Sequence, residues 1–88
     1  MQLQVGLIVR ACAGKESGNF YLIVRQDANF VWLADGKYRT LQNPKRKNPK
    51  HVLPTSVKWN MDGLTDKALR QKLHLLKEGN KFVERRFD

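Results

Sequence analysis

The sequence predicts a small, mainly β protein in which several short strands close into a bent barrel and one helix is appended at the C-terminus. Two patterns indicate this class: apolar residues alternate along the first part of the chain, and leucines recur at helical spacing in the last third. The 88 residues allow one domain. We divide it into a barrel over 1–60, with a basic loop over 42–50, and a helix with its tail over 61–88. Because an isolated hairpin is marginal in water, closure of the strands around one core is the stable arrangement.

Three strands are predicted in the first part of the chain. Apolar residues alternate with their neighbours along 3–11, which predicts a first strand with one buried face. Gly14 and Gly18 bound the turn that follows, because glycine takes a positive φ at no steric cost. Enrichment in β-branched and aromatic residues predicts two more strands, over 20–26 and 30–34.

The middle of the chain is predicted to form a hairpin and an open basic loop. Asp35-Gly36 is a strong signal for a type I′ turn, with 38–41 as the returning strand. Two Asn-Pro pairs bracket three basic residues within 42–50, and proline biases the chain away from helix. We therefore expect 42–50 to be extended and exposed. A short strand over 51–53 follows and ends at the next proline.

The last third predicts one amphipathic helix over 65–78. Thr65 is a suitable N-cap, and Asp66 places a negative charge in the first turn, where the helix dipole favours it. Leucines spaced at i, i+4 and i+7 give the helix one apolar face, and Gly79 is a suitable stop. For the tail over 81–88 two arrangements stay open: packing back on the barrel, or extending away from it.

Charge is distributed unevenly along the chain. The sequence contains 17 Lys and Arg residues against 8 Asp and Glu residues, for a formal charge of +9. Residues 36–61 hold seven of the basic residues and no acidic residue. Solubility is usually served by mixed signs, so a long run without a carboxylate indicates attraction to a polyanion. Nucleic acid is the commonest polyanion that proteins bind.

Two stretches resemble a known family of RNA-binding domains. The strand, glycine-bounded turn and second strand of 5–20 resemble the KOW motif. The stretch over 31–51, which contains Asp-Gly-Lys-x-Arg, Asn-Pro-Lys-x-Lys and Lys-His, is similar to the small bacterial KOW-domain RNA-binding proteins. These in turn resemble a KOW-containing large-subunit ribosomal protein of archaea and eukaryotes. The resemblance covers roughly 3–55 and implies an SH3-like barrel of KOW type that binds RNA, commonly ribosomal RNA.

The resemblance also implies the roles of individual residues. Four of them would shape the turns: Gly14, Gly18, Asp35 and Gly36. Six would lie on the basic face: Lys37, Arg39, Lys45, Lys47, Lys50 and His51. Arg46, from the same run without acids, and Lys15, in the glycine-bounded turn, complete the predicted RNA-binding set. Glu16 departs from the pattern by adding a negative charge to that turn, and nothing beyond residue 60 matches the family.

Aromatic side chains are a second class of candidate, since they stack on unpaired bases. Tyr21 and Tyr38 are the candidates for stacking. Three other rings fit inward positions of strands and are expected in the core: Phe20, Phe30 and Trp32. Trp59 fits equally well against the helix or in an exposed position.

Sequence motifs of catalysis and metal binding are absent. There is no phosphate-binding glycine loop with its lysine, no metal-ligand spacing and no nucleophilic serine elbow, so we expect neither an enzyme nor a cofactor. Cys12, His51 and His74 cannot by themselves supply the four ligands of a structural zinc site. One cysteine excludes an internal disulfide and fits a reducing compartment, so we expect a cytoplasmic protein. No signal peptide, membrane span or oligomer is expected.

Two functions from different classes fit these observations. The first is binding of RNA, in particular ribosomal RNA, through contacts of the basic face with the RNA backbone. The second is a protein-interaction module of the transcription or translation machinery, which would use the barrel loops and the helix over 65–78. The salt dependence of the affinity separates them, because an RNA interface releases counterions.

Overall fold

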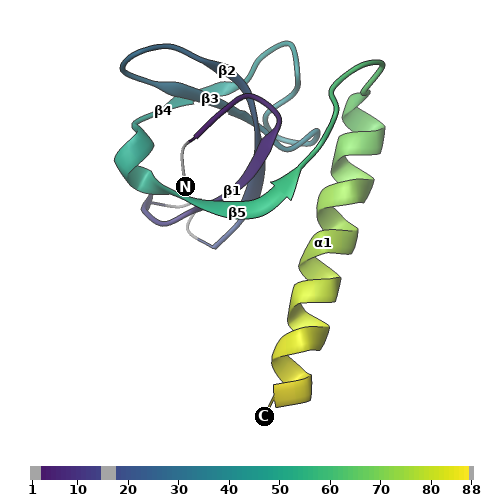
Figure 1. Cartoon of the computed structure of the whole chain (residues 1–88). Coiled ribbons are helices and arrows are strands. Elements are labelled where there is room, and N and C mark those ends of the chain that lie inside the picture. Colours follow the sequence, from purple (N-terminus) through teal and green to yellow (C-terminus); the bar gives the residue numbers. More distant parts are fainter. Residues whose placement is uncertain (1–2, 15–17, 88) are drawn as a thin grey trace.

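The computed structural model describes residues 3–14 and 18–87, with side chains described within these ranges as far as Glu78. Within these ranges, five antiparallel strands form one sheet in the order β4-β3-β2-β1-β5, and a helix follows the last strand (Figure 1). The strands are β1 (Leu7–Ala11), β2 (Phe20–Gln26), β3 (Val31–Ala34), β4 (Lys45–Lys47) and β5 (Val52–Lys58). The sheet curls around its inner face, so the predicted class, a small mainly β barrel with an appended helix, is confirmed.

The sheet buries side chains on both of its faces. The inner face holds the larger cluster: Leu7, Val9, Ala11, Tyr21, Ile23, Val31, Leu33 and Val52. On the outer face, Ile8 and Leu22 meet Leu69 and Leu73 of the helix α1 (Asp66–Phe87). The single buried face predicted for the first strand is therefore wrong at Ile8, which is fully buried because α1 lies over it.

The hairpin from β1 to β2 follows the prediction, although its first strand starts later. β1 begins at Leu7, after a turn in which the Leu7 N–H donates to the Gln4 carbonyl oxygen at 3.2 Å. Gly14 and Gly18 both have the positive φ that was predicted for them. The residues between these glycines, Lys15 among them, lie outside the described residues.

The chain after β3 forms an irregular loop in place of the predicted type I′ hairpin. The Asp35 Oδ1 accepts hydrogen bonds from the N–H groups of Lys37 and Arg39, both at 2.9 Å. A type I′ turn needs a positive φ at both central residues, and no non-glycine residue in the described ranges has one. The returning strand predicted over 38–41 is also wrong. This segment does not pair with β3, and its last residue, Leu41, is hydrogen-bonded to Asp66 at the start of the helix.

Gly36 and Leu41 fasten this loop to the start of α1. Gly36 has a φ of 79°, and a Cβ added there would overlap the carbonyl oxygen of Asp66. The Arg70 Nη1 donates to the Gly36 carbonyl oxygen at 2.9 Å, and the Leu41 N–H donates to the Asp66 Oδ1 at 2.8 Å. Glycine is therefore required at position 36 both by its backbone conformation and by the close approach of the helix.

The segment over 42–50, predicted as an open loop, contains a strand and a 3₁₀ turn. In β4, Arg46 lies opposite Trp32 of β3, and the lysines on either side of it lie opposite core residues. The turn η2 (Pro49–His51) follows, and Asn48 caps it by accepting a backbone N–H at 3.0 Å. Without β4, the backbone groups along this side of β3 would be left unpaired, which favours addition of a strand there.

The last strand is longer than predicted. β5 continues past Pro54, which lies opposite Val9 of β1. Proline cannot donate to a strand ladder, and β5 tolerates it because this strand lies at the edge of the sheet. The register between β1 and β5 shifts between Leu7 and Val9, and there the Thr55 hydroxyl donates to the Ile8 carbonyl oxygen at 2.7 Å.

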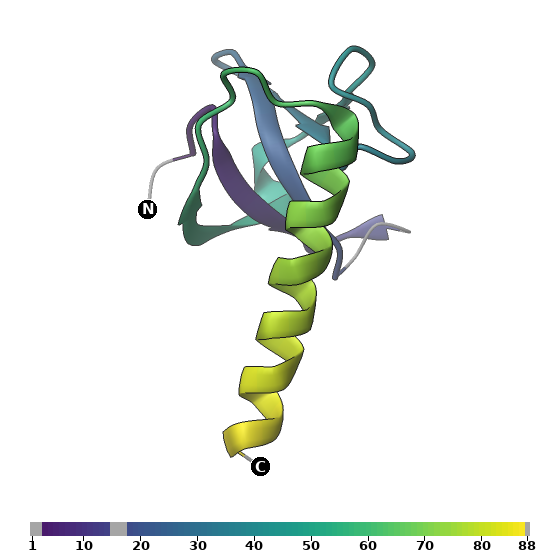
Figure 2. The ribbon, with the colours of Figure 1, turned by 90° about the vertical axis from the view of Figure 1, so that its right-hand side faces the viewer.

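The helix begins as predicted and ends later than predicted. The Thr65 Oγ1 accepts from the Ala68 N–H at 3.1 Å, which confirms the N-cap. α1 then continues through Gly79 to Phe87, so the predicted stop is wrong and 81–87 belong to the helix instead of a separate tail. A glycine inside a helix costs only about 1 kcal/mol relative to alanine, and the good helix formers around it offset that cost. Figure 2 shows the first half of α1 against the barrel and the second half beyond it.

The described part of the chain contains no helix with both the length and the apolar character needed to cross a membrane.

Candidate nucleic-acid interface

Two aromatic rings and two guanidinium groups lie together on β2, β3, β4 and the turn between β2 and β3, at the β4 end of the sheet. We call these four residues, Arg25, Phe30, Trp32 and Arg46, the aromatic–arginine face. The Arg25 Cζ lies 4.6 Å from the Trp32 ring centroid, and the Arg46 Cζ lies 4.6 Å from the Phe30 ring centroid. The two rings meet edge to face, with their centroids 6.5 Å apart and their planes at 71°. The four planar groups therefore adjoin one another on one surface.

The register of the sheet brings these side chains together. Trp32 stands opposite Arg25 of β2 and Arg46 of β4, and residues directly opposite each other share a face of the sheet. A register shift after Ile23 puts Arg25 opposite Trp32, where an uninterrupted ladder would have put Val24. Both arginines are exposed and Trp32 is half-buried, so the face is held by the strands and open to a ligand.

Asp27 fixes the turn between β2 and β3 that carries Phe30. Its Oδ1 accepts from the N–H groups of Asn29 at 2.8 Å and Phe30 at 2.7 Å. These two hydrogen bonds are the main cause that lowers the pKa of Asp27 below its ordinary value of 3.8. The nearby charges of Arg25 and Arg46 lower this pKa further. The ionised carboxylate therefore positions one ring of the aromatic–arginine face.

We expect Asp27→Asn to destabilise the protein near neutral pH and much less in acid. Because the pKa of Asp27 is lower in the folded state, its ionised form contributes stability above about pH 4, and this contribution is lost as the pH falls through the folded-state value. The measurement is the urea midpoint of both proteins at about pH 7 and about pH 2. The difference between the two midpoints should shrink in acid, and a constant difference would contradict the assignment.

Two other carboxylates near the predicted site also bind backbone amides. Asp35 accepts the N–H groups of Lys37 and Arg39, and Asp66 accepts that of Leu41. Both carboxylates are thereby fixed in the loop between β3 and β4 and at the helix start. The two carboxylates therefore stabilise the fold. The basic segment over 36–61 contains no acidic residue that could compensate its positive charge.

The structure does not gather the predicted RNA-binding residues on one face. Among the described members of that set, Arg46 alone lies in the aromatic–arginine face. Lys45 and Lys47 stand opposite the core residues Leu33 and Val31, and side chains alternate along a strand. The two lysines therefore lie on the other side of β4 from Arg46.

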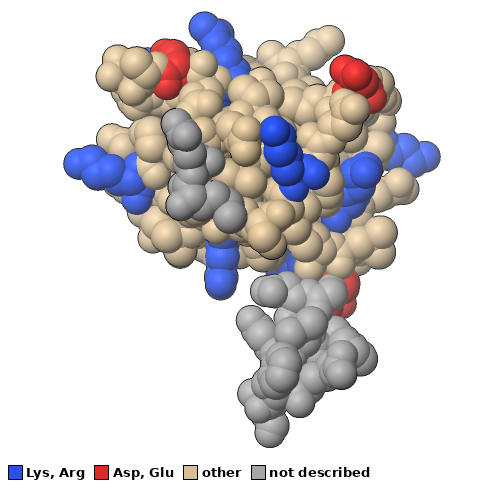
Figure 3. All heavy atoms as spheres, in the orientation of Figure 1, with Lys and Arg blue, Asp and Glu red and all other residues tan. Residues whose placement is uncertain are grey.

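The remaining predicted residues lie in two further places. Lys37 and Arg39 lie in the loop between β3 and β4, and Lys37 also lies beside α1. Lys50 and His51 lie in η2, beside the end of β1, where the His51 carbonyl oxygen accepts a backbone N–H at 2.9 Å. Figure 3 accordingly shows lysine and arginine side chains spread over the visible surface, with no single basic patch. The candidate interface is therefore defined by the aromatic rings that lie beside two of the arginines, and not by the basic residues alone.

The structure corrects most of the aromatic assignments. Tyr21, predicted to stack on bases, is 5% exposed in the inner cluster, whereas Tyr38 is 78% exposed and keeps its candidacy. Phe30 and Trp32, predicted for the core, are only half-buried. Trp59 packs under the helix, with the Lys72 Nζ 5.1 Å from its ring centroid. Phe20 packs against the same outer cluster and is only partly buried.

Arg25 was not singled out from the sequence at all, although a usable signal was present. Val31 and Leu33 are strongly apolar, and their alternation puts Trp32 on the opposite face of β3. An arginine on the preceding strand then becomes a candidate neighbour of the exposed ring. The register shift that brings the two together has no signal in the sequence.

Comparison with known families adds no assignment. A scan against protein-family models finds no match for this chain, so the KOW resemblance stays a prediction.

Proposed function

We propose that the protein binds RNA and that the aromatic–arginine face holds unpaired nucleotides. The observation that carries this proposal is the placement of a guanidinium over each ring, at 4.6 Å in both cases, on the strands of the sheet and the turn between β2 and β3. Bases stack on aromatic rings and on guanidinium planes alike, and arginine also donates paired hydrogen bonds to a phosphate. The face thus offers partners for a base and for the phosphate joined to it.

The charge of the whole chain supports the same partner. A formal charge of +9 attracts a polyanion from a distance and speeds its encounter with the protein. The resemblance to KOW-domain proteins over roughly 3–55 extends the proposal to RNA of the ribosome, bound in the cytoplasm. Binding then combines long-range attraction by the scattered cations with stacking at one place.

The test is the affinity of the double variant Arg25→Gln/Arg46→Gln for a fluorescently labelled single-stranded oligoribonucleotide, measured by anisotropy. We expect binding to weaken by about 10-fold or more, because each guanidinium contributes both a phosphate contact and a stacking surface. The slope of log affinity against log salt should also become less negative by about 1.4, the value for two lost contacts with a single strand.

A charge-matched control separates a local site from net charge. Lys58→Gln/Lys72→Gln removes the same charge from β5 and α1, where Lys58 donates to the Gln4 side chain and Lys72 lies over Trp59. We expect this control to keep most of the affinity. Equal losses in both double variants would remove the aromatic–arginine face from the proposal, and a wild-type protein without RNA affinity would overturn the proposal itself.

A protein partner is the second candidate function. The observation in its favour is on α1, where Leu75 is 70% exposed and the helix extends beyond the barrel (Figure 2). Such a helix can dock in the groove of another protein. The salt titration separates the two functions, because binding through Leu75 would depend little on salt.

A further inference from the structure

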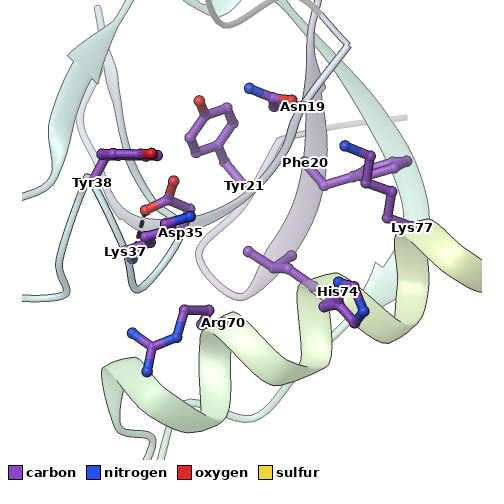
Figure 4. Close-up of a pocket in the computed structure, with 10 residues that line it drawn as sticks. Asn19, Phe20, Tyr21, Asp35, Lys37, Tyr38, Arg70, His74 and Lys77 are labelled. Atoms are coloured by element: carbon purple, nitrogen blue, oxygen red, sulfur yellow. Dashed lines mark hydrogen bonds between the residues drawn. The ribbon is translucent and has the colours of Figure 1, made fainter.

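The loop after β3 and the helix α1 lie on two sides of a cleft outside the aromatic–arginine face; of the predicted RNA-binding residues, the cleft includes Lys37. We call it the barrel–helix cleft. Its cavity has a volume of about 220 Å³, and three of its lining residues carry positive charge: Lys37 from the loop, and Arg70 and Lys77 from α1. Figure 4 shows side chains of β2 and the loop on one side of the cavity and those of α1 on the other. Two separate elements thus bring cations to one cavity.

The electrostatics of the cleft favour an anion. Three permanent cations line it, and the one carboxylate among its lining residues is Asp35. The Asp35 Oδ1 is already occupied by two backbone N–H groups, at 2.9 Å each. Arg70 is held in place by its hydrogen bond to the Gly36 carbonyl oxygen at 2.9 Å, so its charge is positioned before any ligand arrives.

The rest of the lining suits the organic part of a nucleotide. Phe20 and Leu73 supply apolar surface, and Tyr38, 78% exposed, supplies a ring at the cleft. The Lys37 Nζ lies 5.0 Å from the Tyr38 ring centroid, so a cation and an aromatic surface adjoin. A cavity of about 220 Å³ lies below the range of about 300–1,000 Å³ that is typical for larger ligands. A cavity of this size takes only part of a nucleotide, and the remainder stays exposed to solvent.

We infer that the barrel–helix cleft is a second binding site, which takes one phosphorylated nucleotide unit whose phosphate is attracted by the positive charge of Lys37, Arg70 and Lys77. This inference rests on the proposed function, in that the nucleotide is part of the bound RNA. β3 carries Trp32 of the aromatic–arginine face and leads directly into the loop that carries Lys37. The protein then holds an RNA strand at two places that are connected through one short segment of backbone.

The test is an NMR titration of the full chain, labelled with nitrogen-15, with uridine monophosphate and separately with uridine. We expect the monophosphate to shift the amide signals of the loop over 35–38 and of 70–77 in a saturable way. Uridine lacks the phosphate and should leave these signals in place. Equal shifts with both compounds, or no shifts in these segments, would overturn the inference.

Variants connect this titration to binding of RNA. Lys37→Gln/Lys77→Gln removes two exposed cations of the cleft and keeps the hydrogen bond from Arg70 that supports the fold. We expect it to abolish the monophosphate shifts and to weaken oligoribonucleotide binding about 10-fold, while Lys58→Gln/Lys72→Gln keeps both. Retention of the shifts in the cleft variant would also overturn the inference.

The two proposals fail in distinguishable ways. If the oligoribonucleotide binds and depends on Arg25 and Arg46 while the monophosphate shifts nothing, only the cleft is refuted. If the monophosphate shifts the cleft signals and no oligoribonucleotide binds, the proposed function is refuted and the cleft is a site for a free nucleotide.

Discussion

Gly36→Ala is expected to lower the free energy of unfolding by more than about 3 kcal/mol, a large fraction of the stability of a domain of this size. Two causes act together. The φ of 79° is unfavourable for a residue with a side chain, which costs about 1–2 kcal/mol. The added Cβ would also overlap the Asp66 carbonyl oxygen and come within 3.0 Å of the Arg70 backbone nitrogen. Both of these atoms belong to the helix backbone, so relief requires the loop and α1 to move apart.

A second glycine provides the matched control for this experiment. Gly63 also has a positive φ, of 68°, but a Cβ there would meet nothing within 4 Å. Gly63→Ala should therefore show the conformational cost alone, about 1–2 kcal/mol. Urea unfolding of both variants measures the difference. Similar losses in the two proteins would mean that the close approach of α1 to Gly36 contributes nothing.

Trp32→Leu is expected to weaken binding of single-stranded RNA by about 10-fold or more. Stacking of a base on an aromatic ring is worth about 1–3 kcal/mol, and leucine keeps apolar volume without a flat ring. Trp32 is only half-buried, so the urea midpoint should change much less than it does in Gly36→Ala. The measurement is anisotropy with a labelled single strand, alongside a duplex of the same length.

Two comparisons make this prediction specific to stacking. Trp32→Phe retains a ring and should keep most of the affinity. A duplex offers no unpaired base, so its binding should be nearly the same for the wild-type protein and Trp32→Leu. A loss of duplex binding as large as that of the single strand would show that Trp32 supports the surface without stacking on a base.

The local signals in the sequence were sufficient for some elements and not for others. The strand over 20–26 and the N-cap at Thr65 were predicted correctly because both depend on neighbouring residues. β4 consists of three basic residues with no apolar pattern, and it is a strand because β3 offers a partner edge. The helix likewise buries Ile8, although the alternating pattern of the first strand predicts that this residue faces solvent. Contacts between distant segments determine both of these outcomes.

The candidate site also combines features that the local sequence predicts with features that depend on contacts between distant segments. The excess of basic residues after Gly36 was visible in the sequence, and the prediction of a polyanion as partner is based on it. Where those residues lie depends on the alternation along β4, which separates Arg46 from the two lysines beside it. The aromatic–arginine face depends further on the register shift after Ile23, and the barrel–helix cleft depends on the path of α1. Neither of these features has a local sequence signal.

The two outermost strands of the sheet also bear on how copies of the chain behave toward each other. β5 carries Pro54, which cannot donate to an added strand, and β4 consists of Lys45, Arg46 and Lys47, which would meet like charges in a second copy. Sheets with open sides commonly recruit further strands and grow into aggregates, and proline and lysine at such positions oppose that growth. We therefore expect concentrated protein to stay dispersed, with neither side of the sheet acting as a template for polymerisation.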